Sequence, residues 1–239
     1  MKRPKSLGLC VICGQRGAVT RDNVPPGGIF PPPRPSDLVR VPACRPCNNG
    51  TSALDERFRV YLGLHVSRFG GRATRLYEEA RRSLRHNRRL LREVLASVRP
   101  AHLATDHGVI YERGFRILWD SQAHDTIVEK TIRGLYYHHF HDILGPRVKV
   151  DVYWFRSLPK ELAEMSNVWL ANRVGQGDFI YRFGRAEDSP LDSVWIFEFY
   201  GAHWAAGYTS PFEKQPNITF DPTAALPRPP GSVDARGST

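Results

Sequence analysis

The sequence has no long hydrophobic run, few cysteines and little acidic charge in its first hundred residues. No stretch of 18 or more apolar residues occurs among its 239 residues, so it predicts no membrane span. The basic N-terminal stretch lacks the apolar segment of a signal peptide. We therefore expect a cytoplasmic protein with no membrane partner, and in that compartment thiols stay reduced and paired cysteines favour metal over disulfides.

Acidic residues are scarce where basic residues are most frequent. Residues 1–99 contain 20 Lys and Arg against 7 Asp and Glu, a net charge of +13, whereas residues 100–239 contain 14 against 17, a net charge of −3. The two values sum to the overall charge of +10. This asymmetry predicts a polyanionic partner for the N-terminal half.

The hydrophobic content of 41% is sufficient for a folded core, and local patterns predict an α+β protein. Residues 7–66 are expected to form a small metal-stabilised module, residues 67–100 a basic helical extension, residues 101–221 an α+β domain of unknown role and residues 222–239 a disordered tail. Helices are predicted from about Cys44 to His65 and over residues 72–98, 125–144 and 159–172. Strands are predicted over residues 109–119, 148–155, 179–183, 193–200 and about 202–208.

All four cysteines lie in two C-x2-C pairs, Cys10 with Cys13 and Cys44 with Cys47. Two intervening residues let both thiolates of a pair face one ion, and two pairs complete a closed tetrahedral site. Gly14 follows the first pair, where the backbone of a zinc knuckle turns sharply. The pattern predicts structural Zn²⁺ bound by the four thiolates. A redox-active dithiol fits the sequence less well than a zinc site, because no thioredoxin-like βαβ pattern surrounds either cysteine pair.

The motifs between and after these pairs carry a resemblance to a known family. The string C-x2-C-G, then Thr-Arg-Asp-Asn-Val-Pro-Pro, then Val-Pro-Ala-Cys-Arg-Pro-Cys-Asn-Asn resembles the HNH endonucleases, over about residues 9–64. It looks most like the subgroup whose ββα-metal core is braced by a four-cysteine, treble-clef zinc site. The resemblance implies that Asp22 and Asn48 bind a catalytic Mg²⁺ or Mn²⁺ against the scissile phosphate.

The chain departs from the family at Asn23, which occupies the position of the general-base histidine. An amide has no basic lone pair near neutral pH, and loss of a general base costs about 10²–10⁴-fold in rate. Three interpretations stay open: another residue supplies the base, activity is weak, or the module only binds. His65 is a substitute candidate, and Asp37 aligns with a middle Asn of the family.

Arginines crowd the polar faces of the helix predicted over residues 72–98. Such a surface suits the backbone of nucleic acid, with DNA as the expected form, and carries little sequence information. The alternative is a solvated amphipathic face. The arginines are Arg72, Arg75, Arg81, Arg82, Arg85, Arg88, Arg89 and Arg92.

His138 and His141 share one face of the helix predicted over residues 125–144. A second metal site there would need a further ligand, such as His124 or Asp142, and an aromatic-rich helix packed on a sheet is the simpler interpretation.

The leading functional hypothesis is an HNH-like hydrolase that cleaves phosphodiesters with a divalent metal, with Asp22, Asn23 and Asn48 at its centre. The alternative is an inactive, zinc-containing nucleic-acid-binding or interaction module.

Overall fold

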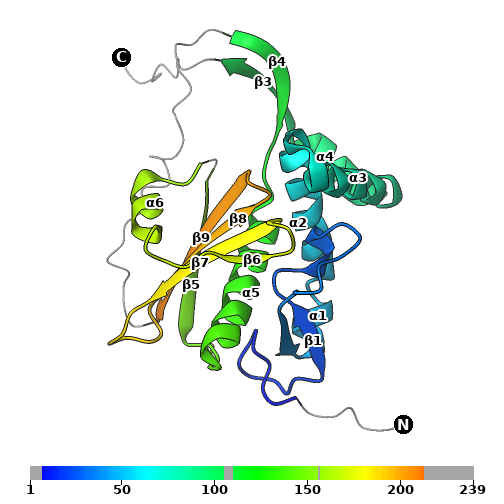
Figure 1. Ribbon diagram of the computed structural model, residues 1–239. Coiled ribbons are helices and arrows are strands. Elements are labelled where there is room, and N and C mark those ends of the chain that lie inside the picture. Colours follow the sequence, from blue (N-terminus) through cyan, green and yellow to red (C-terminus); the bar gives the residue numbers. More distant parts are fainter. Residues whose placement is uncertain (1–6, 105–109, 156, 213–239) are drawn as a thin grey trace, which may run out of the picture.

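A computed structural model describes residues 7–104, 110–155 and 157–212, which form a mixed α+β fold (Figure 1). The expected disordered tail, residues 222–239, lies outside the described residues. None of the described helices combines the length and the apolar character that a bilayer crossing requires.

The N-terminal segment has the order strand, strand, helix. Strand β1 (Thr20–Asn23) pairs antiparallel with β2 (Arg40–Ala43), and the 3-10 turn η1 (Gly27–Ile29) lies in the loop between them. The short helix α1 (Arg45–Asn49) and the longer helix α2 (Ser52–His65) follow. The helix predicted from about Cys44 is therefore interrupted near Gly50, whose backbone N–H bonds to the Pro46 carbonyl.

The single helix predicted over residues 72–98 is wrong in detail, because the structure has two helices there. After the 3-10 turn η2 (Val66–Phe69), α3 (Gly71–His86) and α4 (Arg88–Ser97) are separated by Asn87. The Asn87 side chain accepts a hydrogen bond from the Leu90 backbone N–H at 3.0 Å. Asparagine is a strong N-cap residue, so it starts a new helix here.

A β-hairpin follows α4 and extends away from the rest of the molecule (Figure 1). Its strands are β3 (Val98–Ala104), which was not predicted, and β4 (Ile110–Ile117), which falls within a predicted strand. β3 contains Pro100, which a two-stranded ribbon tolerates because each strand has an edge without a hydrogen-bonding partner.

The C-terminal part is a five-stranded antiparallel sheet in the order β5-β9-β8-β7-β6, with α5 and α6 on opposite faces (Figure 1). The predicted helix over residues 159–172 ends early, at Ser166, and β6 was not predicted. The elements are α5 (Ser121–Phe140), β5 (Val148–Phe155), α6 (Lys160–Ser166), β6 (Asn172–Val174), β7 (Phe179–Arg185), β8 (Ser193–Phe199) and β9 (His203–Pro211).

One hydrophobic core connects the N-terminal segment with the sheet. It contains Val24 and Phe58 from the first segment, Ile132 from α5, and aromatic side chains of β7 and β8. At Gly134 of α5, a Cβ atom would lie 2.6 Å from Val24, so glycine permits this close approach. Helix α5 is thus packed between the N-terminal segment and the sheet, and the division into separate domains stays a prediction.

Candidate metal centre and charged clusters

The two cysteine pairs converge in the structure. The sulfur atoms of Cys10, Cys13, Cys44 and Cys47 all lie within 4.8 Å of one another. In a tetrahedral site with Zn–S bonds of about 2.3 Å the sulfurs lie roughly 3.8 Å apart, so the four thiols could hold a zinc ion with little movement. Among the described residues this is the one group of three or more Cys, His, Asp or Glu side chains with such spacing.

Local backbone geometry explains why the sulfurs converge. Gly14 has φ +63°, and its N–H donates to the Cys10 carbonyl at 2.8 Å, which closes the first knuckle. The Val11 N–H donates to the Pro42 carbonyl at 3.0 Å and so attaches this knuckle to β2. Cys44 is the N-cap residue of α1, which directs both sulfurs of the second pair from one turn.

The donor set fits zinc chemically. Burial raises the pKa of the Cys10 and Cys47 thiols because it disfavours the thiolate form, and the neighbouring sulfurs raise the pKa of Cys47 further. Four adjacent thiolates would need a compensating cation. A divalent zinc ion supplies that charge and favours sulfur ligands. Four protein ligands leave no open position, so the site is structural in character rather than catalytic.

The predicted metal ligand Asp22 is buried and has a lysine partner. The Lys130 Nζ atom, from α5, lies 2.8 Å from Asp22 Oδ2 and 3.7 Å from Asp55 Oδ1, and it donates to Thr51 Oγ1 at 2.9 Å. Only 2% of the Lys130 side chain and 9% of the Asp22 side chain are exposed. Burial raises the pKa of Asp22, and it raises the pKa of Asp55 to about 6.

Asn48 and Asn23 lie close to Asp22 in the structure, but the side chains of the two asparagines lie in different surroundings. The Asn48 amide Nδ2 donates to Thr20 Oγ1 at 3.1 Å and to the Arg21 carbonyl at 3.2 Å, which fixes α1 against β1. Asn23 follows Asp22 in the same strand, so its side chain points to the opposite side of β1. The catalytic roles of these three residues stay predictions.

The other two candidates from the family resemblance lie elsewhere. Asp37 accepts a hydrogen bond from the Gly175 backbone N–H at 3.1 Å, which links the N-terminal loop to the turn after β6. His65 lies at the end of α2, with Nε2 3.4 Å from the Ala202 carbonyl oxygen. Both residues contact segments next to strands of the five-stranded sheet.

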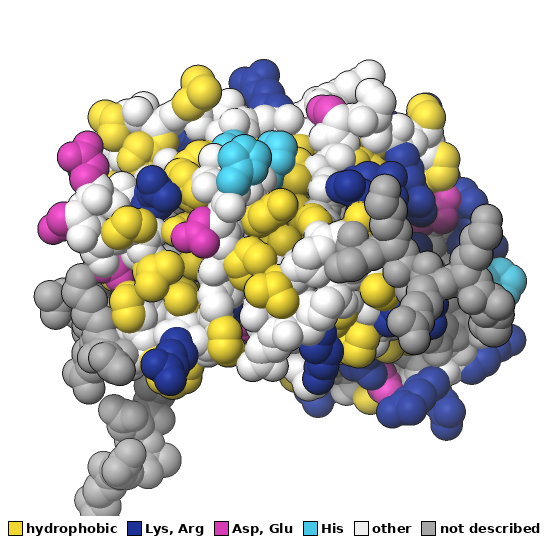
Figure 2. Space-filling model, turned by 90° about the horizontal axis from the view of Figure 1, so that it is seen from below, with side chains coloured by type: hydrophobic (Ala, Val, Ile, Leu, Met, Phe, Trp, Pro, Cys, Tyr) yellow, Lys and Arg dark blue, Asp and Glu magenta, His cyan; other side chains and the backbone are white. Residues whose placement is uncertain are grey.

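The predicted arginine surface is divided between one buried contact and seven exposed side chains. Arg72 forms an ion pair with the buried Asp178 and donates to the Pro31 carbonyl at 3.1 Å, so it connects elements within the protein. The exposed arginines of α3 and α4 are Arg75, Arg81, Arg82, Arg85, Arg88, Arg89 and Arg92. Figure 2 shows many Lys and Arg side chains on the side of the molecule where Figure 1 draws α3 and α4.

The histidines do not form the second metal site considered above among the described residues. His124 is fully buried near the start of α5, where its Nε2 lies 3.2 Å from Nε2 of the buried His203. His139 bonds to the Tyr181 hydroxyl at 2.9 Å, while His138 and His141 are exposed. Figure 2 shows histidine side chains among hydrophobic ones at the lower end of the molecule.

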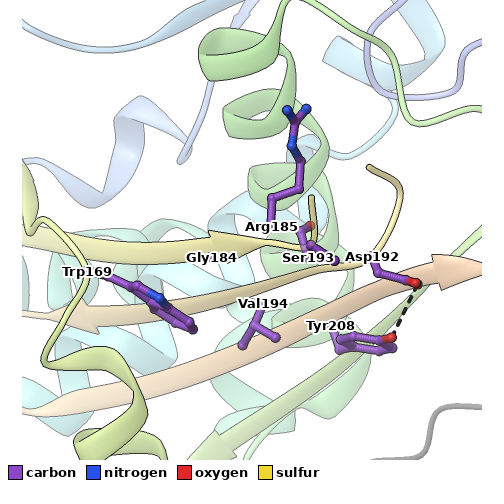
Figure 3. A pocket seen from close by; sticks show the side chains of 8 residues that line it. Trp169, Gly184, Arg185, Asp192, Ser193, Val194 and Tyr208 are labelled. Carbon is purple, nitrogen blue, oxygen red and sulfur yellow. Dashed lines mark hydrogen bonds between the residues drawn. The ribbon is translucent and has the colours of Figure 1, made fainter. Parts of the chain in front are cut away.

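The sheet carries a cavity of about 370 Å³ on the face away from α5 (Figure 3). Its polar groups are bonded within the protein: the Tyr208 hydroxyl donates to Asp192 Oδ1 at 3.2 Å, and Ser193 Oγ lies 2.6 Å from Thr209 Oγ1. Arg185 points toward α5, with its Cζ atom 3.9 Å from the centre of the Phe140 ring. These contacts indicate a structural crevice.

Comparisons of the chain with protein-family models, with curated proteins and with solved structures found no match. The resemblance to HNH endonucleases therefore depends on the sequence motifs alone.

Proposed function

We propose that this chain is a zinc-braced, HNH-like module that binds nucleic acid through α3 and α4 and does not hydrolyse it. Zinc would hold the two knuckles together, and the arginines would contact phosphates. Mg²⁺ or Mn²⁺ would have no role at Asp22. The competing hypothesis is a metal-dependent endonuclease centred on Asp22 and Asn48.

The contact between Lys130 and Asp22 carries this proposal. A catalytic carboxylate must bind a metal ion and face the substrate, whereas Asp22 is buried and its charge is compensated by an ammonium group. A metal ion at Asp22 would separate the buried Lys130 ammonium group from its nearest carboxylate, which is unfavourable. Asn23 also occupies the position of the general base. Compared with the family site, the metal-binding carboxylate is therefore paired with a lysine, and the proton acceptor is replaced by an amide.

The nucleic-acid part of the proposal is supported by the charge of α3 and α4. Their buried sides carry Leu76, Leu84 and Val94, so the arginines face solvent. Two of the seven have acidic partners: Arg82 is paired with Glu79 and Arg89 with Glu93, at 3.1 and 3.0 Å. Most of the positive charge is therefore available to phosphates.

One experiment tests both parts on the zinc-loaded, full-length protein. Binding of a labelled duplex is measured by fluorescence anisotropy at several salt concentrations, and nicking of supercoiled plasmid is measured with Mg²⁺ and Mn²⁺. We expect salt-dependent binding and no nicking in the parent and in Asp22→Ala. Nicking in the parent that disappears in Asp22→Ala would overturn the non-catalytic assignment.

The arginine surface has a matched control. In the double variant R85Q/R92Q, log Kd should depend less steeply on log salt, by about 0.9 for each phosphate that the variant no longer neutralises. The variant R147Q/R173Q removes exposed arginines outside α3 and α4 and should bind like the parent. Equal weakening of binding in the two variants would show non-specific attraction by net charge and would contradict the proposed surface.

A further inference from the structure

The hairpin of β3 and β4 presents an aromatic side chain to solvent close to the arginine-bearing helices. Phe115 of β4 is 76% exposed, although burial of such a ring would contribute favourably to folding. Ile117, two residues further and on the same side of the strand, packs against the cluster that contains Leu90 and Val94 of α4. Phe115 therefore lies beyond the edge of that cluster, on the side of the hairpin that faces the helices.

Among the described residues, exposed arginines accompany Phe115 on the hairpin and on the helix that leads into it. Arg116 follows Phe115 in β4 and pairs across the hairpin with the exposed Arg99 of β3, and α4, which leads directly into β3, presents Arg92 to solvent. The acidic side chain of α4, Glu93, is already paired with Arg57 and Arg89. An aromatic ring next to several cations fits a ligand with flat apolar faces and a repeated negative charge.

We propose that this surface binds single-stranded nucleic acid, with one base stacked on Phe115 and phosphates of the same strand on Arg99, Arg116 and the arginines of α4. This inference depends on the proposed nucleic-acid binding and specifies its substrate class. In a duplex the base faces are already stacked on one another, so a ring on a projecting hairpin contacts only the backbone. In a single strand the bases are accessible, and an aromatic side chain with a basic track is the usual means of binding them.

The test compares one labelled 20-nucleotide strand with its duplex, by fluorescence anisotropy on the full-length, zinc-loaded protein. Phe115→Ala should weaken single-strand binding by about 5- to 150-fold, the range for loss of one stacked base, and should leave duplex binding within about 2-fold. Phe115→Trp, which keeps an aromatic ring at this position, should bind the single strand with an affinity close to that of the parent. Leu118→Ala, which removes an exposed apolar side chain just after the end of β4, should have no effect on either.

The outcomes separate this inference from the proposed function. Equal weakening of single-strand and duplex binding by Phe115→Ala, or no weakening of either, would overturn stacking at Phe115 while the arginine surface still stands. Absence of binding to both nucleic acids would overturn both proposals. Conversion of a dimer to a monomer by Phe115→Ala, measured by light scattering, would show that a second copy of the chain covers the ring and would also overturn the inference. Unchanged melting temperatures confirm that the variants are folded.

Discussion

Around the cysteines, few apolar side chains accompany the sulfurs: Ala43 is buried with Cys10 and Cys44, and Ile12 is partly buried. Around α5, in contrast, the strands contribute large aromatic side chains, among them the fully buried Trp195 and Phe197. The cysteine cluster has too little hydrophobic surface of its own to be held together by burial, so we expect bound zinc to stabilise it. The second has that surface in excess. The two regions thus reach an ordered backbone by different chemistry.

Removing zinc tests this difference most strongly and should have the largest effect. Apparent zinc-binding free energies are on the order of 10 kcal/mol in small zinc modules, and these are also folding free energies. We expect a strong chelator, or Cys44→Ala, to release one zinc ion per chain and to remove hydrogen-exchange protection from β1 and β2. The amides of β8 and β9 should stay protected, and added zinc should restore the parent. Loss of protection throughout the sheet would show that the two regions are not distinct.

Lys130 lies where the two regions meet, and Lys130→Ala should have the next largest effect. The substitution leaves Asp22 buried without its cation, which costs about 3–5 kcal/mol. Lys149→Ala is the matched control, because its ammonium pairs with Asp151 near the surface, at 2.7 Å with 46% of the lysine side chain exposed, and should cost less than about 1 kcal/mol. Urea unfolding measures both.

A double-mutant cycle sharpens the result for Lys130. Since Asp22→Asn removes the charge that Lys130 compensates, Lys130→Met together with Asp22→Asn should be less destabilising than the sum of the single changes. Additive effects would mean that the two side chains do not interact in solution, and would also remove the observation that carries the non-catalytic assignment.

The smallest expected effect is on how the free energy of unfolding depends on pH, where the buried histidines and the buried carboxylate Asp55 act in opposite directions. Burial lowers the pKa of His124 and of His203. The nearby His124 and His65 lower the pKa of His203 further, whereas Asp125 raises the pKa of His124. The unfolded chain therefore takes up protons first as pH falls below about 6.5, and the free energy of unfolding decreases by up to about 1.4 kcal/mol per pH unit for each histidine.

Asp55 acts in the opposite direction. Its pKa is raised to about 6, so the folded chain takes up this proton before the unfolded chain does, and stability increases as pH falls through 6. Asp55→Asn should therefore make the loss of stability between pH 6.5 and 5 steeper, while His203→Asn should make it shallower. Urea unfolding at several pH values measures both slopes, and identical slopes in the two variants would contradict the assignment of these groups.

The sequence predicted structure correctly where the pattern involves residues close together in the chain. The spacing of Cys10 and Cys13 predicted a knuckle, and four thiols do converge. Asn87 is a visible N-cap residue, but the uninterrupted apolar stripe on either side of it favoured one long helix. β3 was missed because Pro100 indicates the end of a helix more clearly than it indicates a strand.

Contacts between distant segments could not be predicted from one sequence. Asp22 looked like a metal ligand because its motif is local, whereas its partner Lys130 lies in a helix 108 residues away. The sequence did show a charged residue, Lys130, between the apolar positions Ile127 and Ile132 of that helix, but this pattern does not identify the residue that pairs with it. His124 was considered only as a further ligand for a site with His138 and His141, and its neighbour in the structure, His203 of β9, could not be identified from the sequence.

The position of Lys130 has a consequence for how the protein is made. A ribosome adds about 5–20 residues per second, so Asp22 is synthesised roughly 5–20 s before its counter-ion. During this interval the nascent N-terminal segment can bind zinc through its four thiolates, but Val24 and Asp22 still lack α5. We therefore expect the two cysteine knuckles to become ordered first on the ribosome, and the ion pair between Asp22 and Lys130 to form only after residue 130 has emerged.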